Sequence, residues 1–416
     1  MGSTELSQVF VPRAAGNGRS GAAQVATLVS AIRKHLDMDV AFVSEFKHGR
    51  RHFRHVDARL PTLLVQEGAS HPLEETLCLR VVDGRLPEVI ADAMRVPAAL
   101  EVAATSAVPV GAHLSVPIRL RDGTVYGTFC CFSFTANPSL NERDLGMMRV
   151  FADLTAEQID GDLERSRIRT EAEGRINTVL VNDAVSMLYQ PIVHVARERI
   201  VGYEALARFS MEPSRAPDVW FNEAADVGKG LALEIKVIQK SLPALRSLPG
   251  DAYLALNMSP ETLLYGDLKT LFRGWPLDRI VVEVTEHAII DHYGDIAAVV
   301  DPLRRLGLRV AVDDAGAGYA SFRHILSLAP DIIKLDMSIT RNIHQDRARR
   351  ALAAALIGFA TATGSKIVAE GVESVLELGV LRELGVNKAQ GYFIGKPMTL
   401  TAAAAFGLSM SGAGTA

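Results

Sequence analysis

The second half of the chain alternates short apolar runs with longer segments that have the apolar spacing of helices. Eight runs are rich in aliphatic and β-branched residues, which is typical of buried strands. They are Met187–Val195, Ile200–Phe209, Tyr253–Met258, Ile280–Val284, Val310–Asp313, Ile332–Leu335, Lys366–Ala369 and Ala389–Ile394. Helical segments such as Ala224–Leu248 and Arg347–Thr363 separate most of them. This order predicts an α/β barrel of the TIM type.

The first two of these runs are joined by only a few residues around Arg197–Arg199. A connection between parallel strands needs a crossover of a dozen residues or more, which this link cannot provide. We therefore expect one antiparallel strand in the barrel.

The first half has a different pattern, in which a helix precedes two pairs of strands. The predicted elements are a helix at Ala23–Leu36 and strands at Val40–Phe46, Arg51–Asp57, Leu114–Leu120 and Val125–Phe134. The turn Arg121–Thr124 makes the last two a hairpin, which we place at the centre of an antiparallel sheet. The long connection Leu60–Ala112 is consistent with a ligand lid and equally with structural irregularity.

Between the halves, Ala152, Ala156, Ile159 and Leu163 recur at helical spacing among charged residues. A two-stranded dimer helix and a single helix packed on its own domain both fit this pattern. We divide the chain into a flexible N-terminus 1–20, an α+β domain 21–150, a helical linker 151–177, a barrel 178–405 and a flexible tail 406–416.

Composition narrows the function classes. Lys and Arg number 44 and Asp and Glu number 48, so the net charge of −4 gives no reason to expect nucleic-acid or membrane-surface binding. Neither a transmembrane helix nor a signal peptide is predicted, and we expect a cytoplasmic protein. The cysteines Cys78, Cys130 and Cys131 are too few and too irregular to predict disulfides or a zinc site, and we expect the last two to fill a strand core.

Polar residues interrupt the predicted barrel strands near their ends. Taken alone, Asp313–Asp314 would fit a surface turn, but seven strands carry such residues: Glu204, Asn257, Glu283, Asp313 with Asp314, Lys334, Glu370 and Gln390. Because barrel active sites lie at strand ends, we expect these side chains to converge. A set of oxygen ligands favours Mg²⁺ or Mn²⁺, and the doublet suits two ions. Lys334 would orient water or stabilise phosphate charge, and Arg208 would hold a phosphate oxygen.

Several short motifs resemble those of the EAL-domain family of cyclic di-GMP phosphodiesterases. They are Tyr189–Val193, Gly202–Arg208, Leu256–Ser259, Glu283–Glu286, Asp313–Gly316, Lys334–Asp336, Ala369–Glu373 and Gln390–Tyr392. The resemblance covers residues 178–405. It implies metal ligation by Glu204, Asn257, Glu283, Asp313, Asp314, Glu370 and Gln390, and catalysis by Lys334 with Glu204 and Glu370. It further implies substrate contacts by Gln190 and Arg208, and support by Glu286 and Glu373.

The N-terminal domain resembles a GAF domain over residues 21–160, in its order of elements and in the run Met38–Phe46. This implies a small-molecule, redox or light input and a homodimer, but no residue set specifies the ligand. Ala112 precedes His113 where some chromophore-binding relatives have cysteine, so we expect no covalent chromophore. We interpret His48, His52 and His55 as solvated side chains.

These observations predict metal-dependent hydrolysis of cyclic di-GMP to linear 5′-pGpG, regulated by the GAF-like domain. The alternatives are a non-catalytic cyclic di-GMP receptor that signals to a protein partner and a phosphodiesterase for other diesters. One departure from the family pattern is the presence of Ala315 and Ala317 where Phe and Thr are usual, which leaves the tuning of that loop open.

Overall fold

The computed structural model describes residues 21–60, 65–102, 105, 108–284, 293–315 and 325–412. The chain divides into two compact units, Met1–Ile168 and Arg169–Ala416. The division falls inside α6, a helix that spans Glu142–Val181 and contains the predicted linker 151–177. Each unit is described separately below.

Unit 1 is built on an antiparallel sheet with the strand order β3-β2-β1-β6-β5-β4. The strands are β1 (Val40–Lys47), β2 (Arg50–Ala58), β3 (Ser70–Pro72), β4 (Val89–Ile90), β5 (Ala112–Arg119) and β6 (Val125–Ser133). The predicted strand pairs are confirmed. The middle of the sheet is the β1–β6 pair, however, so the β5–β6 hairpin lies to one side of it.

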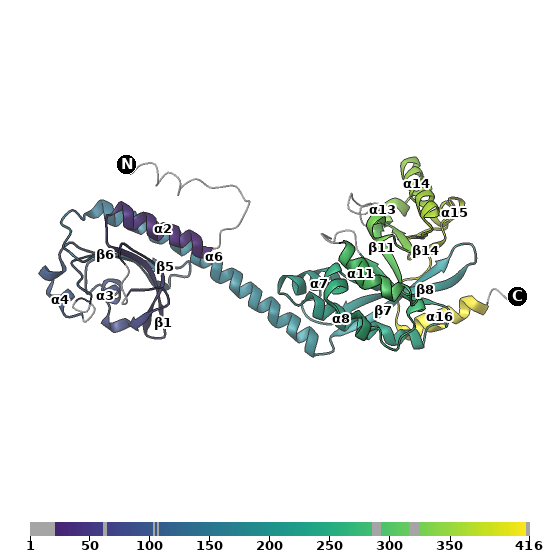
Figure 1. Cartoon of the computed structure of the whole chain (residues 1–416), viewed down its shortest axis with the longest axis horizontal. Helices are drawn as coiled ribbons and strands as arrows, with labels where there is room; N and C mark the ends of the chain where they lie inside the picture. The colour runs from purple at the N-terminus through teal and green to yellow at the C-terminus, as the bar shows by residue number, and fades with distance from the viewer. Residues whose placement is uncertain are drawn as a thin grey trace. The chain divides into compact units, whose positions relative to one another are not determined.

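Side chains that alternate along these strands fill two cores, one on each face of the sheet. Ala41 and Cys131 face the core under α2 (Gly21–His35) and the first part of α6. Their neighbours Val40 and Cys130 face the second core, under α3 (Leu77–Val82) and α4 (Pro97–Leu100). Figure 1 shows α2 and the start of α6 lying along the same face of the sheet. Both cysteines are buried, as predicted.

The connection between residues 60 and 112 contains the two edge strands β3 and β4 and the helices α3 and α4. It therefore covers one face of the sheet and completes both edges. Strands of two or three residues are too short to give a periodic signal, so the sequence did not predict them.

The helix α6 packs on unit 1 near its start and on unit 2 near its end. Phe151 and Ala152 belong to a core of unit 1, and Ile176 and Val179 belong to a core of unit 2. Residues 163–171 between them are exposed on every side. Pairing of this segment in a dimer stays a prediction, which light scattering of the full chain would test.

Unit 2 is a closed barrel of eight strands in the order β10-β11-β12-β13-β14-β7-β8-β9. The strands are β7 (Val185–His194), β8 (Arg199–Phe209), β9 (Tyr253–Asn257), β10 (Ile280–Val284), β11 (Arg309–Ala315), β12 (Ile332–Leu335), β13 (Lys366–Ala369) and β14 (Lys388–Gln390). Strand β7 is antiparallel to both of its neighbours, and the other pairs are parallel. The predicted antiparallel strand is thus β7.

Helices surround this barrel (Figure 1). They are α7 (Pro217–Asp226), α8 (Gly230–Ser241), α9 (Pro260–Tyr265), α10 (Leu268–Leu271), α11 (Tyr293–Arg304), α13 (Met337–Thr340), α14 (Arg347–Thr363), α15 (Val375–Glu383) and α16 (Leu400–Gly412). Among the described residues, no helix has both the length and the apolar character needed to cross a membrane.

Three predicted boundaries were wrong. The single helix expected at Ala224–Leu248 is broken at Gly228, where φ is +73°, into α7 and α8. The strand expected at Ala389–Ile394 ends at Gln390, because Gly391 turns the chain. Residues 406–412, expected to be flexible, are the end of the helix α16.

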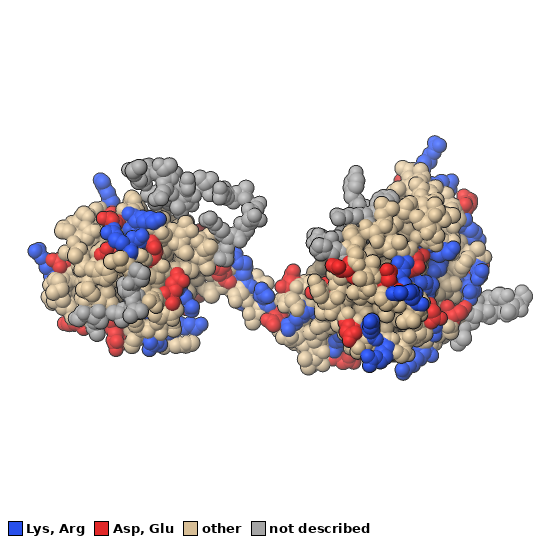
Figure 2. Space-filling model, in the orientation of Figure 1, with Lys and Arg blue, Asp and Glu red and all other residues tan. Residues whose placement is uncertain are grey.

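Lys and Arg are interspersed with Asp and Glu on the face of each unit seen in Figure 2, in keeping with the small net charge.

Candidate active site

The candidate residues occupy one layer of the barrel interior. Side chains of alternate residues point inward. Ile192 and Tyr253 pack there against one apolar layer of the parallel strands, which consists of Ala255, Val281, Ala311, Ile332 and Val368. Two residues further along their parallel strands come Asn257, Glu283, Asp313, Lys334 and Glu370. Gln190 precedes Ile192 by two on the reversed strand β7, so it reaches the same end. The two-residue alternation of side chains that places apolar residues in the core therefore also places these polar residues side by side.

Lys334 lies at the centre of this layer with only 1% of its side chain exposed. Its Nζ is 2.8 Å from Glu283 Oε2 and 3.0 Å from Asp313 Oδ1. It is also 2.7 Å from Glu370 Oε1 and 3.5 Å from Glu204 Oε2. One buried ammonium thus stands between four carboxylates, and its charge is what allows them to lie so close together.

Two amides fix the orientation of Glu204. Asn257 Nδ2 donates to Glu204 Oε1 at 3.0 Å, and Gln390 Nε2 donates to Glu204 Oε2 at 2.7 Å. Gln390 Nε2 also contacts Gln190 Oε1 at 2.9 Å, and Gln190 Nε2 donates to the carbonyl of Gly395 at 3.1 Å. Gln190, which the EAL resemblance assigned to substrate, therefore also positions Gln390 here.

A β-bulge brings both members of the aspartate doublet into the site. From Val312 to Ala315 the strand β11 advances three residues while its partner β12 advances two, from Ile333 to Leu335. Asp314 has φ +53°, in the left-handed region, and its N–H donates to Asp313 Oδ1 at 3.0 Å. In a regular strand the two side chains would point to opposite faces. The bulge lets both carboxylates join the same cluster.

Glu370 follows β13 and precedes a turn at Gly371. The Glu370 N–H donates to the carbonyl of Leu335 at 3.1 Å, and its own carbonyl accepts from the Thr340 hydroxyl. Gly371 has φ +62°, and a Cβ at this position would lie 2.5 Å from Met337 Cβ. Only glycine fits both conditions without displacing its neighbours.

Gly371→Ala should therefore lower the free energy of unfolding of the metal-free chain by about 1–3 kcal/mol. The matched control is Gly379→Ala inside α15, where a Cβ meets nothing within 4 Å. This control should raise the free energy of unfolding by about 0.5–1 kcal/mol. Urea denaturation measures both variants. Equal stability of the two would show that the turn at Gly371 does not constrain Glu370.

The carboxylates form two overlapping groups with the spacing of metal ligands. In one, ligand atoms of Glu204, Glu283 and Asp313 lie within 4.8 Å of one another, and in the other those of Asp313, Asp314 and Glu370 do so. Asp313 belongs to both groups. The Oε1 atom of Gln390 is buried and finds no hydrogen-bond partner among the described residues. Hard oxygen donors, a shared carboxylate and an unsatisfied buried oxygen all fit divalent cations such as Mg²⁺ or Mn²⁺.

The electrostatics of the cluster follow from burial and from Lys334. Burial raises the pKa of Glu283 and of Glu370 well above the usual value for a carboxyl group, although Lys334 opposes this. Burial acts in the same direction on Glu204, but the charge of Lys334 and the hydrogen bonds from the two amides lower its pKa overall. Burial alone would lower the pKa of Lys334, yet the surrounding carboxylates raise it well above its usual value. Lys334 is therefore a cation at neutral pH.

Other predicted residues lie away from the cluster. Arg208 is four residues beyond Glu204 on β8, about 13 Å along the strand. Glu373 is exposed and pairs with Arg341 at 2.8 Å, so it joins neither carboxylate group. Ala315 is buried on β11. Glu286 and Ala317 lie outside the described residues.

One supporting residue was missed in the sequence. Glu377, near the start of α15, accepts hydrogen bonds from the N–H groups of Asn342, Glu373 and Ser374. It thereby ties the loop after Glu370 to the loop after α13. Ser374 and Glu377 form a capping box, and the Ser-x-x-Glu spacing was the signal that would have revealed it.

A closed barrel with one reversed strand and an acidic cluster at its strand ends defines the class of this unit. Residues 173–397 match the EAL domain family, and residues 24–160 match a GAF domain. Because the first match covers more than half of the chain, this protein belongs to the EAL-domain family, with a GAF domain preceding the barrel.

Two relatives and one solved structure illustrate the similarity. The chain is 28% identical over 316 residues to the cyclic di-GMP phosphodiesterase PdeR of Escherichia coli K12, covering 70% of this chain and 43% of that protein. It is 29% identical over 253 residues to the cyclic di-GMP phosphodiesterase NbdA of Pseudomonas aeruginosa, covering 58% and 32%. This chain thus spans less than half the length of either. The PaMucR phosphodiesterase in complex with c-di-GMP superimposes with a TM-score of 0.51 at 23% identity, covering 56% of this chain and 99% of that one, which shows a shared fold.

Proposed function

We propose that the barrel hydrolyses cyclic di-GMP to linear 5′-pGpG with Mg²⁺ or Mn²⁺ as cofactor. The observation that carries this proposal is the pair of carboxylate groups that share Asp313 and surround Lys334. The ligands would be Glu204, Asn257, Glu283, Asp313, Asp314, Glu370 and Gln390. The names of the relatives PdeR and NbdA support the choice of substrate.

Divalent cations bound in this layer would neutralise phosphate charge and make water a better nucleophile at neutral pH. The water oxygen bonds to phosphorus, the bond from phosphorus to the 3′ oxygen breaks, and the 3′ oxygen leaves with a proton. One phosphodiester is opened in this way, which gives a 5′-phosphate and a free 3′-hydroxyl.

The residues of the chain orient this reaction. Lys334 carries a positive charge and donates hydrogen bonds, so its role is to hold the attacking water and to stabilise charge on the phosphate. Glu370, half-buried and 2.7 Å from Lys334 Nζ, accepts the proton of the water. Asn257 and Gln390 keep Glu204 in a single orientation. Arg208, further along β8, reaches the second phosphate of a dinucleotide.

Incubation of the purified full chain with cyclic di-GMP and Mg²⁺ or Mn²⁺, followed by chromatography, tests the proposal. We expect conversion to pGpG, which an excess of chelator stops and re-addition of the cation restores. Binding without pGpG would instead identify a receptor. Faster hydrolysis of other linear or cyclic diesters in the same assay would contradict the choice of substrate.

Regulation by the GAF domain belongs to the same proposal. The feature that supports it is α6, a continuous helix whose two ends contribute to the cores of both units. A change in the packing of the first part of α6 would therefore reach the barrel through one continuous helix.

A further inference from the structure

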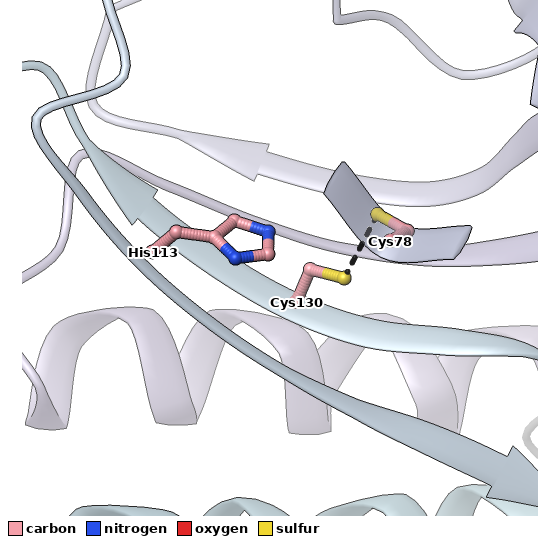
Figure 3. Close-up of side chains that lie close together, drawn as sticks. All are labelled: Cys78, His113 and Cys130. Carbon is pink, nitrogen blue, oxygen red and sulfur yellow. Dashed lines mark hydrogen bonds between the residues drawn. The ribbon is translucent and has the colours of Figure 1, made fainter. Parts of the chain in front are cut away.

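A second group of ligand atoms is buried in unit 1, away from the barrel. Cys78 lies on α3, His113 on β5 and Cys130 on β6, and one ligand atom from each lies within 4.8 Å of the other two. The two sulfur atoms are 3.4 Å apart. Figure 3 shows the His113 ring directed toward the two sulfur atoms. The sequence analysis did not predict this group, because 35 and 17 positions separate its members along the chain.

These side chains are sealed from solvent. The exposed fractions are 0% for both cysteines and 2% for His113. The Nδ1 atom of His113 is buried without a hydrogen-bond partner among the described residues. Figure 3 shows the other ring nitrogen, Nε2, on the side of the sulfur atoms, so Nε2 is the atom of His113 that can join them in holding a ligand.

A cation lies beside the sulfur atoms. Arg51 NH1 is 3.3 Å from Cys78 Sγ, and the Arg51 residue is only 7% exposed. Its guanidinium stacks 4.5 Å from the centre of the Phe53 ring and 5.4 Å from that of Phe42. The Ser115 hydroxyl lies 2.9 Å from Cys130 Sγ. The Cys78 sulfur therefore has a cation beside it that stabilises a thiolate. The Cys130 sulfur has a hydroxyl that can donate to it, although burial raises the pKa of Cys130 well above its usual value.

We propose that Cys78, Cys130 and His113 bind one soft monovalent metal ion, Cu(I), in the core of the GAF domain. Thiolate sulfur and imidazole nitrogen select soft and borderline metals over Mg²⁺ or Mn²⁺. Two thiolates and a monovalent ion carry a net charge of −1, which the buried guanidinium of Arg51 balances. With Zn²⁺ the same group would leave a net charge of +1 in an apolar core, which is unfavourable.

The geometry requires little movement. In a three-coordinate site the ligands lie about 120° apart, so two sulfur ligands with metal–sulfur bonds of about 2.3 Å lie about 4.0 Å apart. The observed sulfur–sulfur distance of 3.4 Å would have to increase by about 0.6 Å. Rotation about the Cα–Cβ bonds of the cysteines supplies this.

Competition for Cu(I) tests the site. The reduced full chain is titrated anaerobically with Cu(I) against the chelator bicinchoninate, with ascorbate present. We expect one Cu(I) per chain for the wild type and an affinity at least a hundredfold lower for Cys78→Ala and for Cys130→Ala. The matched control is Cys131→Ala, which removes a buried cysteine on the opposite face of the sheet and should leave binding unchanged.

X-ray absorption at the copper edge of the wild-type protein gives a second measurement that needs no variant. Two sulfur ligands and one nitrogen ligand are expected. Retention of copper by both cysteine variants, a wild type that takes up none, or a preference for Zn²⁺ with four ligands would each overturn the proposal. None of these measurements depends on hydrolysis by the barrel.

Discussion

Replacing Asp313 by asparagine should lower the rate of cyclic di-GMP hydrolysis about a thousandfold, equivalent to about 4 kcal/mol of activation free energy. Asp313 belongs to both carboxylate groups, so the change removes negative charge from both proposed metal positions. Asparagine has nearly the same shape, and the fold should survive. The measurement is the initial rate of pGpG formation at saturating Mn²⁺.

The matched control for this variant is Asp301→Asn. Asp301 is exposed on α11, outside the barrel interior. The same chemical change there should leave the rate within about twofold. A loss under tenfold for Asp313→Asn, with the circular dichroism spectrum unchanged, would refute the assignment of Asp313 as a shared ligand.

Replacing Lys334 by methionine should lower kcat about 10² to 10⁴-fold while KM changes by less than about threefold. The ammonium is proposed to orient the water and to stabilise the charge that develops on the phosphate in the transition state. Binding of the substrate in the ground state depends less on these interactions. The same change leaves four carboxylates without their buried counter-ion. The metal-free variant should therefore lose about 3–5 kcal/mol of stability in urea.

Added Mn²⁺ should restore part of that stability, since a divalent cation neutralises the same carboxylates. Lys366→Met is the control, because Lys366 is exposed at the start of the adjoining strand β13. It should change neither kcat nor the response to Mn²⁺. If Lys334→Met instead raised KM as strongly as it lowered kcat, Lys334 would be a substrate clamp.

The barrel and most of its site were predictable because both depend on the same period of two. Five of the parallel strands, β9 to β13, carry an apolar residue at an inward position and a polar residue two places further on, as at Val281 and Glu283 or Ile332 and Lys334. Because successive strands carry a polar residue in that place, these side chains meet at one end of the barrel interior. The reversed strand β7 followed from a loop too short for a crossover.

The features that the sequence did not predict depend on backbone detail and on contacts across the sheet. The bulge that turns both Asp313 and Asp314 into the cluster has no sequence signal apart from the doublet. The direction of Glu373 is set by Arg341, a partner that only the fold provides. Cys78 meets Cys130 because a helix in the long connection covers one face of the sheet, and no spacing rule links those positions.

The proposed hydrolysis requires water held in the barrel to open one phosphodiester of cyclic di-GMP. A single-turnover reaction of the full chain with Mn²⁺ in ¹⁸O-labelled water, followed by mass spectrometry of the product, tests it most directly. We expect pGpG with one ¹⁸O atom on its 5′-phosphate. Cyclic di-GMP recovered intact from a saturated complex, or pGpG without the label, would contradict it.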